Sequence, residues 1–202
     1  MRIALFTDSF WPQINGVTTS IWNTCETLAE KGNHFIIYAP KPDHFSANAP
    51  HHPNIQFVWL PSKPLPTYTD YLIAYSFSKD AEKTFLAFNP EIVHVHTPFF
   101  VAKKGIELAR KKKIPVIGTF HTVLSEFLDY IPIPAIKNNP IMKELTWKYT
   151  QYFYGKCDLV TTPTEVLATE LRTHGFLRVK VLSNAIDYDL FSKTKAKKNR
   201  LS

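Results

Sequence analysis

Short apolar runs recur along this chain of 202 residues, and segments of helical length separate most of them. Several runs are apolar throughout rather than alternating with polar residues, which is typical of parallel strands that are buried on both faces. The predicted strands are 3–6, 35–38, 55–60, 92–96, 116–120, 159–161 and 179–182. Strand and helix in alternation predict an α/β fold: a doubly wound, mainly parallel sheet with helices on both faces.

The segments between the strands set the domain organisation. The predicted helices are 17–31, 71–88, 103–113, 142–154 and 165–174. Gly32 and Gly175 follow two of them, at the position where glycine commonly ends a helix. The segments 40–53 and 131–140, rich in proline, are predicted to be loops or lids. We expect one domain over residues 1–186, followed by a polar tail, 187–202, that resembles a linker or the point where a longer chain was cut.

Composition excludes several classes of protein. With 45% hydrophobic residues the chain is not predominantly disordered, and it has neither G-x-G-x-x-G nor G-x-x-x-x-G-K-[ST], so the common dinucleotide and P-loop motifs are absent. Cys25 and Cys157 lack the spacing of a disulfide framework or a zinc finger. The amino terminus does not resemble a signal peptide, and no apolar run reaches the roughly 18 residues that span a bilayer. We therefore expect a cytoplasmic protein.

The net charge of +7 is concentrated in two places. One is the tail, and the other is the predicted helix 103–113, in which a single acid, Glu107, stands among many bases. These bases are Lys103, Lys104, Arg110, Lys111, Lys112 and Lys113. A basic face of this kind suits an anionic membrane surface or nucleic acid, although a solvated helix face is the commoner meaning.

Polar residues follow the first predicted strand, at the edge where sheets of this class bind ligands. Asp8 comes directly after the strand, and Asn15 and Gly16 precede the next predicted helix. A glycine at a helix amino terminus allows backbone N–H groups to approach an anion closely, with help from the helix dipole. The alternative is an ordinary Asn-Gly turn.

Three histidines stand at the ends of two other strands. His94 and His96 share one face of a strand, and His121 follows the next strand in the context T-F-H-T. A metal site is not expected, because no carboxylate or thiolate ligand is evident nearby. His121 could instead donate to a sugar hydroxyl or stabilise developing charge. Asp187 and Asp189 form a D-x-D, which we interpret as helix-start residues rather than metal ligands.

Five segments together carry a family resemblance over essentially the whole chain: RIALFTDSFWPQINGVTTSIWNTCETLAEKGNHFIIYAP, PEIVHVHTPFF, IPVIGTFHT, CDLVTTPTEVLATEL and VKVLSNAID. They resemble the amino-terminal half of retaining glycosyltransferases with the GT-B fold. More narrowly, they are similar to the group-1 family, which includes phosphatidylinositol mannosyltransferases and diacylglycerol glucosyltransferases. The opening P-Q-I-N-G-V-T-T-S and the F-H-T are most similar to the lipid glucosyltransferases.

The resemblance implies roles for single residues. Gly16, with Asn15 beside it, matches the loop that approaches the donor diphosphate, and His121 matches the active-site histidine that contacts the donor sugar. Asn184 lies at the family's Asn-Gly position, where this chain has Ala185 instead of glycine. Further contacts to donor or acceptor are expected from Asp8, Trp11, His96 and Tyr130.

The implied function is that of the acceptor-side half of a retaining hexosyltransferase. It would move a hexose from UDP- or GDP-hexose to a lipid or glycan hydroxyl, without a metal or other cofactor and with no role for nucleic acid. A carboxy-terminal donor-binding domain with an E-x7-E motif is not in this chain, so we expect the isolated half to be inactive. The helix 103–113 would face the inner surface of the membrane. The alternatives are a non-catalytic domain that binds membrane or nucleic acid, and another nucleotide-sugar enzyme such as an epimerase.

Overall fold

The computed structural model describes residues 1–13, 15–44, 49–65, 68–121, 123–124 and 139–184. Seven parallel strands form one sheet in the order β3-β2-β1-β6-β7-β8-β9. Their bounds are β1 (Arg2–Thr7), β2 (His34–Pro40), β3 (Ile55–Leu60), β6 (Ile92–His96), β7 (Val116–Thr119), β8 (Leu159–Thr162) and β9 (Val179–Val181). Each predicted strand is found in this sheet, and the predicted fold class is confirmed.

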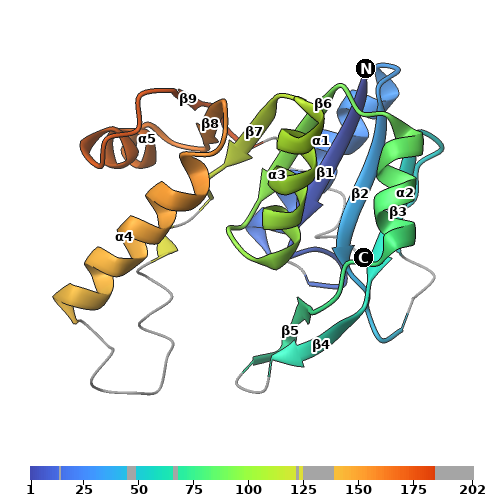
Figure 1. The fold of residues 1–202 in the computed structure, drawn as a ribbon, viewed down its shortest axis with the longest axis horizontal. Helices are drawn as coiled ribbons and strands as arrows, with labels where there is room; N and C mark the ends of the chain where they lie inside the picture. The colour runs from blue at the N-terminus through green and yellow to red at the C-terminus, as the bar shows by residue number, and fades with distance from the viewer. Residues whose placement is uncertain (14, 45–48, 66–67, 122, 125–138, 185–202) are drawn as a thin grey trace, which may run out of the picture.

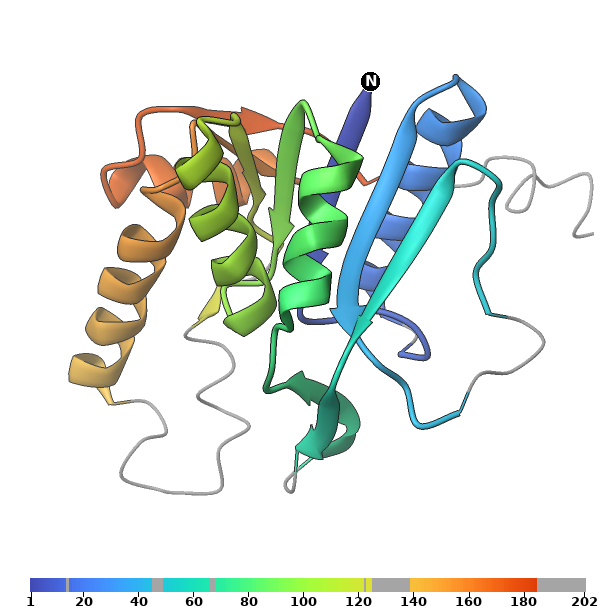
Figure 2. The ribbon, with the colours of Figure 1, turned by 45° about the vertical axis from the view of Figure 1, so that its right-hand side comes forward.

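Helices cover both faces of the sheet, with α1 behind it and α2 and α3 in front (Figures 1 and 2). The helices are α1 (Gly16–Glu30), α2 (Lys79–Phe88), α3 (Phe100–Lys112), α4 (Pro140–Tyr154) and α5 (Glu165–Thr173). Gly32 and Gly175 follow the ends of α1 and α5 as predicted, and their φ angles of +82° and +85° are in the left-handed region that glycine favours there. In the described part of the chain, no helix combines the length and apolar character that crossing a membrane requires.

Neighbouring residues of β1 belong to different cores, because side chains alternate across a strand. Ala4 and Phe6 pack in the larger hydrophobic cluster with α2 and α3, whereas Leu5 packs in a second cluster with α1. Phe6 is fully buried and stacks on Tyr38 of β2, with ring centroids 4.4 Å apart. Burial on both faces explains why these strands are continuously apolar in sequence.

The predicted helix 71–88 is wrong over its first half. Residues 71–74 belong to strand β5 (Tyr68–Ala74), which pairs antiparallel with β4 (Ser62–Leu65) in a separate two-stranded sheet. The helix begins only after Ser78, whose hydroxyl oxygen accepts from the Ala81 amide at 3.1 Å. The apolar residues 71–77 fit a helical pattern as well as a strand, and pairing with β4 decides between them. In the two predicted loop segments, 40–53 and 131–140, residues 45–48 and 131–138 lie outside the described residues.

The direction of winding reverses between β1 and β6. From β1 the chain proceeds to β2 and β3 on one side, and from β6 it proceeds to β7, β8 and β9 on the other. The two strands at the reversal are direct neighbours, with Thr7 opposite His96 at their carboxyl ends. In open α/β sheets such a switch point leaves a crevice in which ligands bind.

Candidate active site

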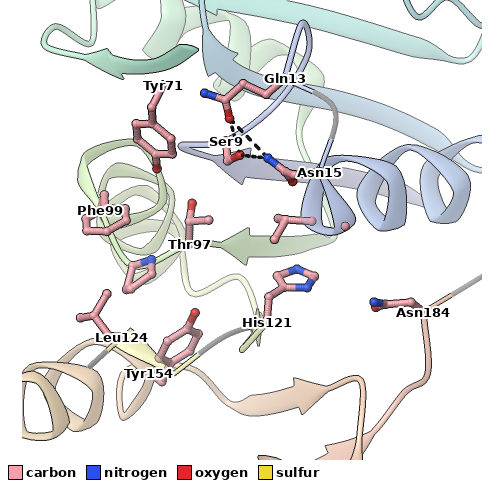
Figure 3. Close-up of a pocket in the computed structure, with 13 residues that line it drawn as sticks. Ser9, Gln13, Asn15, Tyr71, Thr97, Phe99, His121, Leu124, Tyr154 and Asn184 are labelled. Carbon is pink, nitrogen blue, oxygen red and sulfur yellow. Dashed lines mark hydrogen bonds between the residues drawn. The ribbon is translucent and has the colours of Figure 1, made fainter. Parts of the chain in front are cut away.

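A cavity of about 390 Å³ lies at the carboxyl ends of β1 and β6, at this switch point. Ser9, Gln13 and Asn15 line it from the β1–α1 connection, and His121, Leu124 and Tyr154 line it from the opposite side (Figure 3). The remaining lining residues are Gly16, Val17, Tyr71, Thr97, Pro98, Phe99 and Asn184. The structure therefore brings four predicted site residues, Asn15, Gly16, His121 and Asn184, into one cavity.

The amino terminus of α1 opens into this cavity. Asn15 is its N-cap, and its side-chain oxygen accepts from the Thr18 amide at 2.9 Å. Within the described part of the chain, the N–H groups of Gly16 and Val17 have no acceptor, which is the usual state of a first helical turn. A Cβ added to Gly16 would meet nothing within 4 Å, so the space beside it is open to a ligand. This geometry suits an anion such as a phosphate.

A polar network holds the α1 cap in place. The Ser9 hydroxyl donates to Oε1 of Gln13 at 2.8 Å, and Nδ2 of Asn15 donates to the Ser9 oxygen at 3.2 Å (Figure 3). Because the amide nitrogen of Asn15 is engaged in this way, its oxygen is left to cap the helix. Ser9 and Gln13 were not singled out in the sequence, since their roles depend on how the β1–α1 connection folds back.

Asn184 reaches the same cavity from the far end of the chain. The Ser20 hydroxyl of α1 donates to its side-chain oxygen at 2.9 Å, across 164 positions of sequence. This contact ties the segment after β9 to the first helix. Ala185, which follows it in the place of the family's glycine, lies outside the described residues.

Behind His121 runs a chain of histidine and threonine contacts. Nε2 of His121 lies 2.8 Å from Nδ1 of His96, a distance at which one ring donates to the other. The ring of His96 packs against that of His94 with centroids 4.1 Å apart and the ring planes tilted by 41°. Nε2 of His94 lies 2.6 Å from the Thr119 hydroxyl, which in turn contacts the Thr161 hydroxyl at 2.8 Å. The contacts cross three neighbouring strands and fix the orientation of the His96 ring.

Burial makes all three rings neutral at pH 7. It lowers the pKa of His121 from 6.5 to about 4, and that of His94 to about 3. The pKa of His96 is also far below its usual range, because of burial first and then its histidine neighbours. Although three histidines gather here, the described residues contain no group of three His, Cys, Asp or Glu suited to a metal ion.

Asp8 is placed at the amino terminus of α3. Its side chain is 4% exposed, and its two oxygens accept from the amides of Val101 and Ala102 at 2.7 and 3.2 Å. The helix's own N-cap, Phe99, makes no side-chain cap, so Asp8 supplies one from β1. Burial raises the pKa of Asp8 to about 7, although the two amide donors oppose this shift. Asp8 is therefore engaged in holding the fold rather than lining the cavity.

Thr97 carries backbone strain at the mouth of the cavity. Its φ is +61°, which is unusual for a β-branched residue. Its hydroxyl oxygen accepts from the Asp8 amide at 2.9 Å, and the hydroxyl donates to the carbonyl of His96. Strain of this kind persists only where neighbouring contacts hold it, and it is concentrated at functional sites.

One side of the cavity is apolar and aromatic. Phe99, Leu124 and Tyr154 line it, and the Tyr154 hydroxyl donates to the carbonyl of Thr119 at 3.1 Å. Tyr71 reaches the cavity from the β4–β5 hairpin, and burial raises the pKa of its hydroxyl. Tyr71 was missed in sequence because its segment resembled a helix.

The other predicted contacts lie elsewhere. Trp11 packs against the core cluster beneath α1, and His96 is 4% exposed, behind His121 rather than on the cavity wall. Tyr130, Asp187 and Asp189 lie outside the described residues, as does the whole predicted tail 187–202. Of the predicted contacts within the described chain, Asp8, Trp11 and His96 therefore support the site rather than line it.

The predicted basic face is the outer surface of α3. Five of the six predicted basic residues lie in α3, and Lys113 is its C-cap. They lie away from the buried residues of the helix, which include Val101, Ile106 and Ala109. Lys104 pairs with Glu107 at 2.8 Å, and Lys111 pairs with Glu82 of α2 at 3.3 Å. Helix geometry places Lys103 and the run ending at Lys113 about 15 Å apart. Only the first end, with Lys103 and Lys104, follows the cavity residues Pro98 and Phe99.

Residues 14–190 match the family described as Glycosyltransferase Family 4, which covers well over half of the chain. The chain belongs to this family. The resemblance seen in the sequence is thereby confirmed.

Two curated relatives and one solved structure give the range of similarity. The chain is 29% identical over 202 residues to the alpha-monoglucosyldiacylglycerol synthase of Streptococcus pneumoniae, covering 100% of this chain and 44% of the relative. It is 24% identical over 191 residues to the GDP-mannose-dependent alpha-mannosyltransferase of Corynebacterium glutamicum, covering 95% and 45%. A sucrose-phosphate synthase structure from Thermosynechococcus elongatus has a TM-score of 0.57 at 14% identity, covering 99% of this chain and 98% of that one. The chain spans less than half the length of these two curated relatives, and the solved structure supports the fold alone.

Proposed function

We propose that this chain is the acceptor-side half of a retaining hexosyltransferase that moves a hexose from a nucleotide-sugar to a lipid or glycan hydroxyl. One observation carries the proposal: the N–H groups of Gly16 and Val17, which have no acceptor among the described residues, and the ring of His121 line the same cavity, at the switch point of the sheet. The first is suited to a diphosphate and the second to a sugar. Family membership and the names of the two curated relatives support the same reaction class.

In the proposed mechanism the chain stabilises the leaving group and orients the sugar. The amides of Gly16 and Val17, with the dipole of α1, would stabilise the negative charge that develops on the diphosphate. Neutral His121 would hydrogen-bond the hexose without adding a charge. The apolar wall at Phe99 and Leu124 would bind the apolar part of the acceptor molecule and hold its hydroxyl near the hexose carbon that is transferred. Residues outside this chain would hold the nucleotide.

The reaction itself is tested by hexose transfer in the complete protein. UDP-glucose and GDP-mannose are offered separately with vesicles that contain diacylglycerol, and labelled glycolipid is measured. We expect transfer from one of the two donors, with retention of the anomeric configuration in the product. If neither donor yields product while the protein binds anionic vesicles in a salt-sensitive way, the non-catalytic membrane-binding alternative is favoured instead.

Substitution of Gly16 tests the diphosphate site. Gly16→Ala should leave the free energy of unfolding nearly unchanged, since the added Cβ meets nothing within 4 Å. The same methyl group would occupy the space through which a phosphate oxygen approaches the helix. We expect KM for the nucleotide-sugar to rise about tenfold, the equivalent of one charge-assisted hydrogen bond. Thr19→Ala, an exposed change on the same helix, is the control. An unaltered KM in Gly16→Ala would contradict the assignment.

A lipid acceptor calls for contact with a membrane, and α4 offers a surface for it. The side chains of Ile141, Leu145, Tyr149 and Tyr152 recur at helical spacing on α4 and are 38–67% exposed. This set is the α4 stripe. The Tyr149 hydroxyl of the stripe donates to the carbonyl of Pro98 at 2.5 Å, two residues before α3 begins, so the first turn of α3 lies close to the stripe. We propose that the α4 stripe and the Lys103 end of α3 together contact an anionic bilayer.

Vesicle flotation separates this surface from the far end of α3. Changing Lys103 and Lys104 to Gln should weaken binding to anionic vesicles by roughly thirtyfold, at about 1 kcal/mol for each lysine near the surface. Changing Lys112 and Lys113 to Gln is the matched control, since these residues end the same helix away from the cavity. Equal losses in the two double variants would mean that the whole basic face of α3 contacts the membrane, as the sequence alone suggests.

A further inference from the structure

We propose that buried His96 is a positioning residue for His121: Nδ1–H of His96 donates to Nε2 of His121, so that His121 offers its own Nδ1–H to a ligand in the cavity. This inference rests on the proposed function, in which His121 meets the donor sugar. It concerns the position of a proton, which follows from three observations on the two rings.

The first observation is the contact itself. Nδ1 of His96 and Nε2 of His121 are 2.8 Å apart, and both rings are neutral at pH 7 because burial lowers their pKa values. In a hydrogen bond between two neutral imidazoles, one ring supplies the N–H and the other supplies the lone pair of its unprotonated nitrogen. Either His96 donates to His121, or His121 donates to His96.

The second observation decides between these two arrangements. Nε2 of His96 is buried and has no hydrogen-bond partner among the described residues. If His121 were the donor, this nitrogen would carry a proton, and an N–H group would be buried without an acceptor. A buried N–H without a partner is rarer and costlier than a buried lone pair. The proton of His96 therefore belongs on Nδ1, and Nε2 of His121 is the acceptor.

The third observation concerns what remains to His121. Its ring lines the cavity, and its other nitrogen, Nδ1, has no partner among the described residues. With Nε2 acting as acceptor, the ring proton of His121 is on Nδ1. A ring N–H in the cavity suits an oxygen with a free lone pair, such as a sugar hydroxyl or a phosphate oxygen.

His96 is held so that it can impose this arrangement. It is 4% exposed, and its ring packs at a tilt against His94, which is hydrogen-bonded through Thr119 to Thr161. Rotation of the His96 ring would break its contact with His121 and crowd His94. The orientation of the His96 ring, the hydrogen-bond donor, is thus set by residues of three strands, β6, β7 and β8, and not by the ligand.

Nitrogen NMR tests the proton position directly, with no need for enzyme activity. In the complete protein labelled with ¹⁵N, long-range ¹H–¹⁵N spectra at pH 7 should show His121 with its proton on Nδ1. A spectrum with the proton on Nε2 would overturn the proposal. Since this result does not depend on any substrate, it stands even if the protein transfers no hexose, and the two proposals can fail separately.

Two substitutions at His96 test its effect on transfer. Asn places an amide N–H near the position of Nδ1, whereas Leu fills the space without a donor. We expect His96→Leu to lower kcat about 10–100-fold, as loss of an orienting partner commonly does, and to give His121 a mixed tautomer signal. His96→Asn should retain the Nδ1–H signal of His121 and most of the activity. If Leu and Asn behave alike in both readouts, His96 serves only packing and the proposal is wrong; if Leu does not fold, the spectrum of the unaltered protein still decides.

Discussion

Replacing His121 with alanine is expected to lower kcat for hexose transfer about 10²–10³-fold in the complete protein. The ring lines the cavity opposite the amino terminus of α1, so it can meet the sugar while the helix meets the diphosphate. Loss of one preorganised donor at a site of developing charge typically has an effect of this size. The measurement is the initial rate of glycolipid formation at saturating nucleotide-sugar.

Two controls accompany this variant. His34→Ala removes an exposed imidazole at the start of β2 and should leave the rate unchanged. The free energy of unfolding should fall by roughly 1–3 kcal/mol in His121→Ala, because loss of the ring leaves the buried N–H of His96 without its acceptor, and the protein should remain folded. A stably folded His121→Ala protein with a normal rate would remove His121 from the mechanism.

Acid should destabilise the protein strongly between pH 6.5 and about 4. In this range the unfolded chain takes up protons on His94, His96 and His121, whose ordinary pKa is 6.5, while the folded chain keeps the rings neutral. The stability that neutral rings provide is complete above pH 6.5 and is lost as the pH falls. Asp8 has the opposite effect on stability, because its raised pKa makes the folded chain bind this proton at a higher pH than the unfolded chain does.

Near pH 5 the unfolded chain binds about two protons more than the folded chain at these four groups, three more on the histidines and one fewer on Asp8. Near pH 5 the free energy of unfolding should therefore fall by roughly 3 kcal/mol for each pH unit, which urea titrations at several pH values can measure. His121→Asn removes one of the three histidines and should lower this slope by about one proton. A free energy of unfolding that stays constant from pH 7 to pH 4.5 would show that the rings are not buried in neutral form.

The sequence predicted most of the fold because its signals are local. Each of the seven strands is an apolar run, and the positive φ of Gly32 and Gly175 matches their place after a helix. The prediction of a helix over the segment 71–77 was wrong because its apolar pattern fits a helix as well as a strand. Only its pairing with residues 62–65, a contact between separate segments, selected the strand and brought Tyr71 to the cavity.

The residues of the candidate site also differ in whether neighbouring sequence was enough to predict their roles. Gly16, Asn15 and His121 could be named in advance because each stands directly after a strand or before a helix, which are local positions. The role of Asp8 could not, since the α3 amides that it caps are more than 90 positions away in sequence. The link between His96 and His121 depends on the register of β6 and β7, which places His96 opposite Thr119.

By itself, the sequence determined the class of fold, the family resemblance and the strand ends from which a site would be built, because apolar periodicity and short motifs are written in neighbouring residues. The tertiary structure alone decided the order of the strands, and with it the switch point between β1 and β6. It also decided which polar groups are buried together. Hydrogen bonding and the pKa of a buried ring depend on distances across the sheet, and residues 25 or 164 positions apart acquire such distances only when the chain has folded.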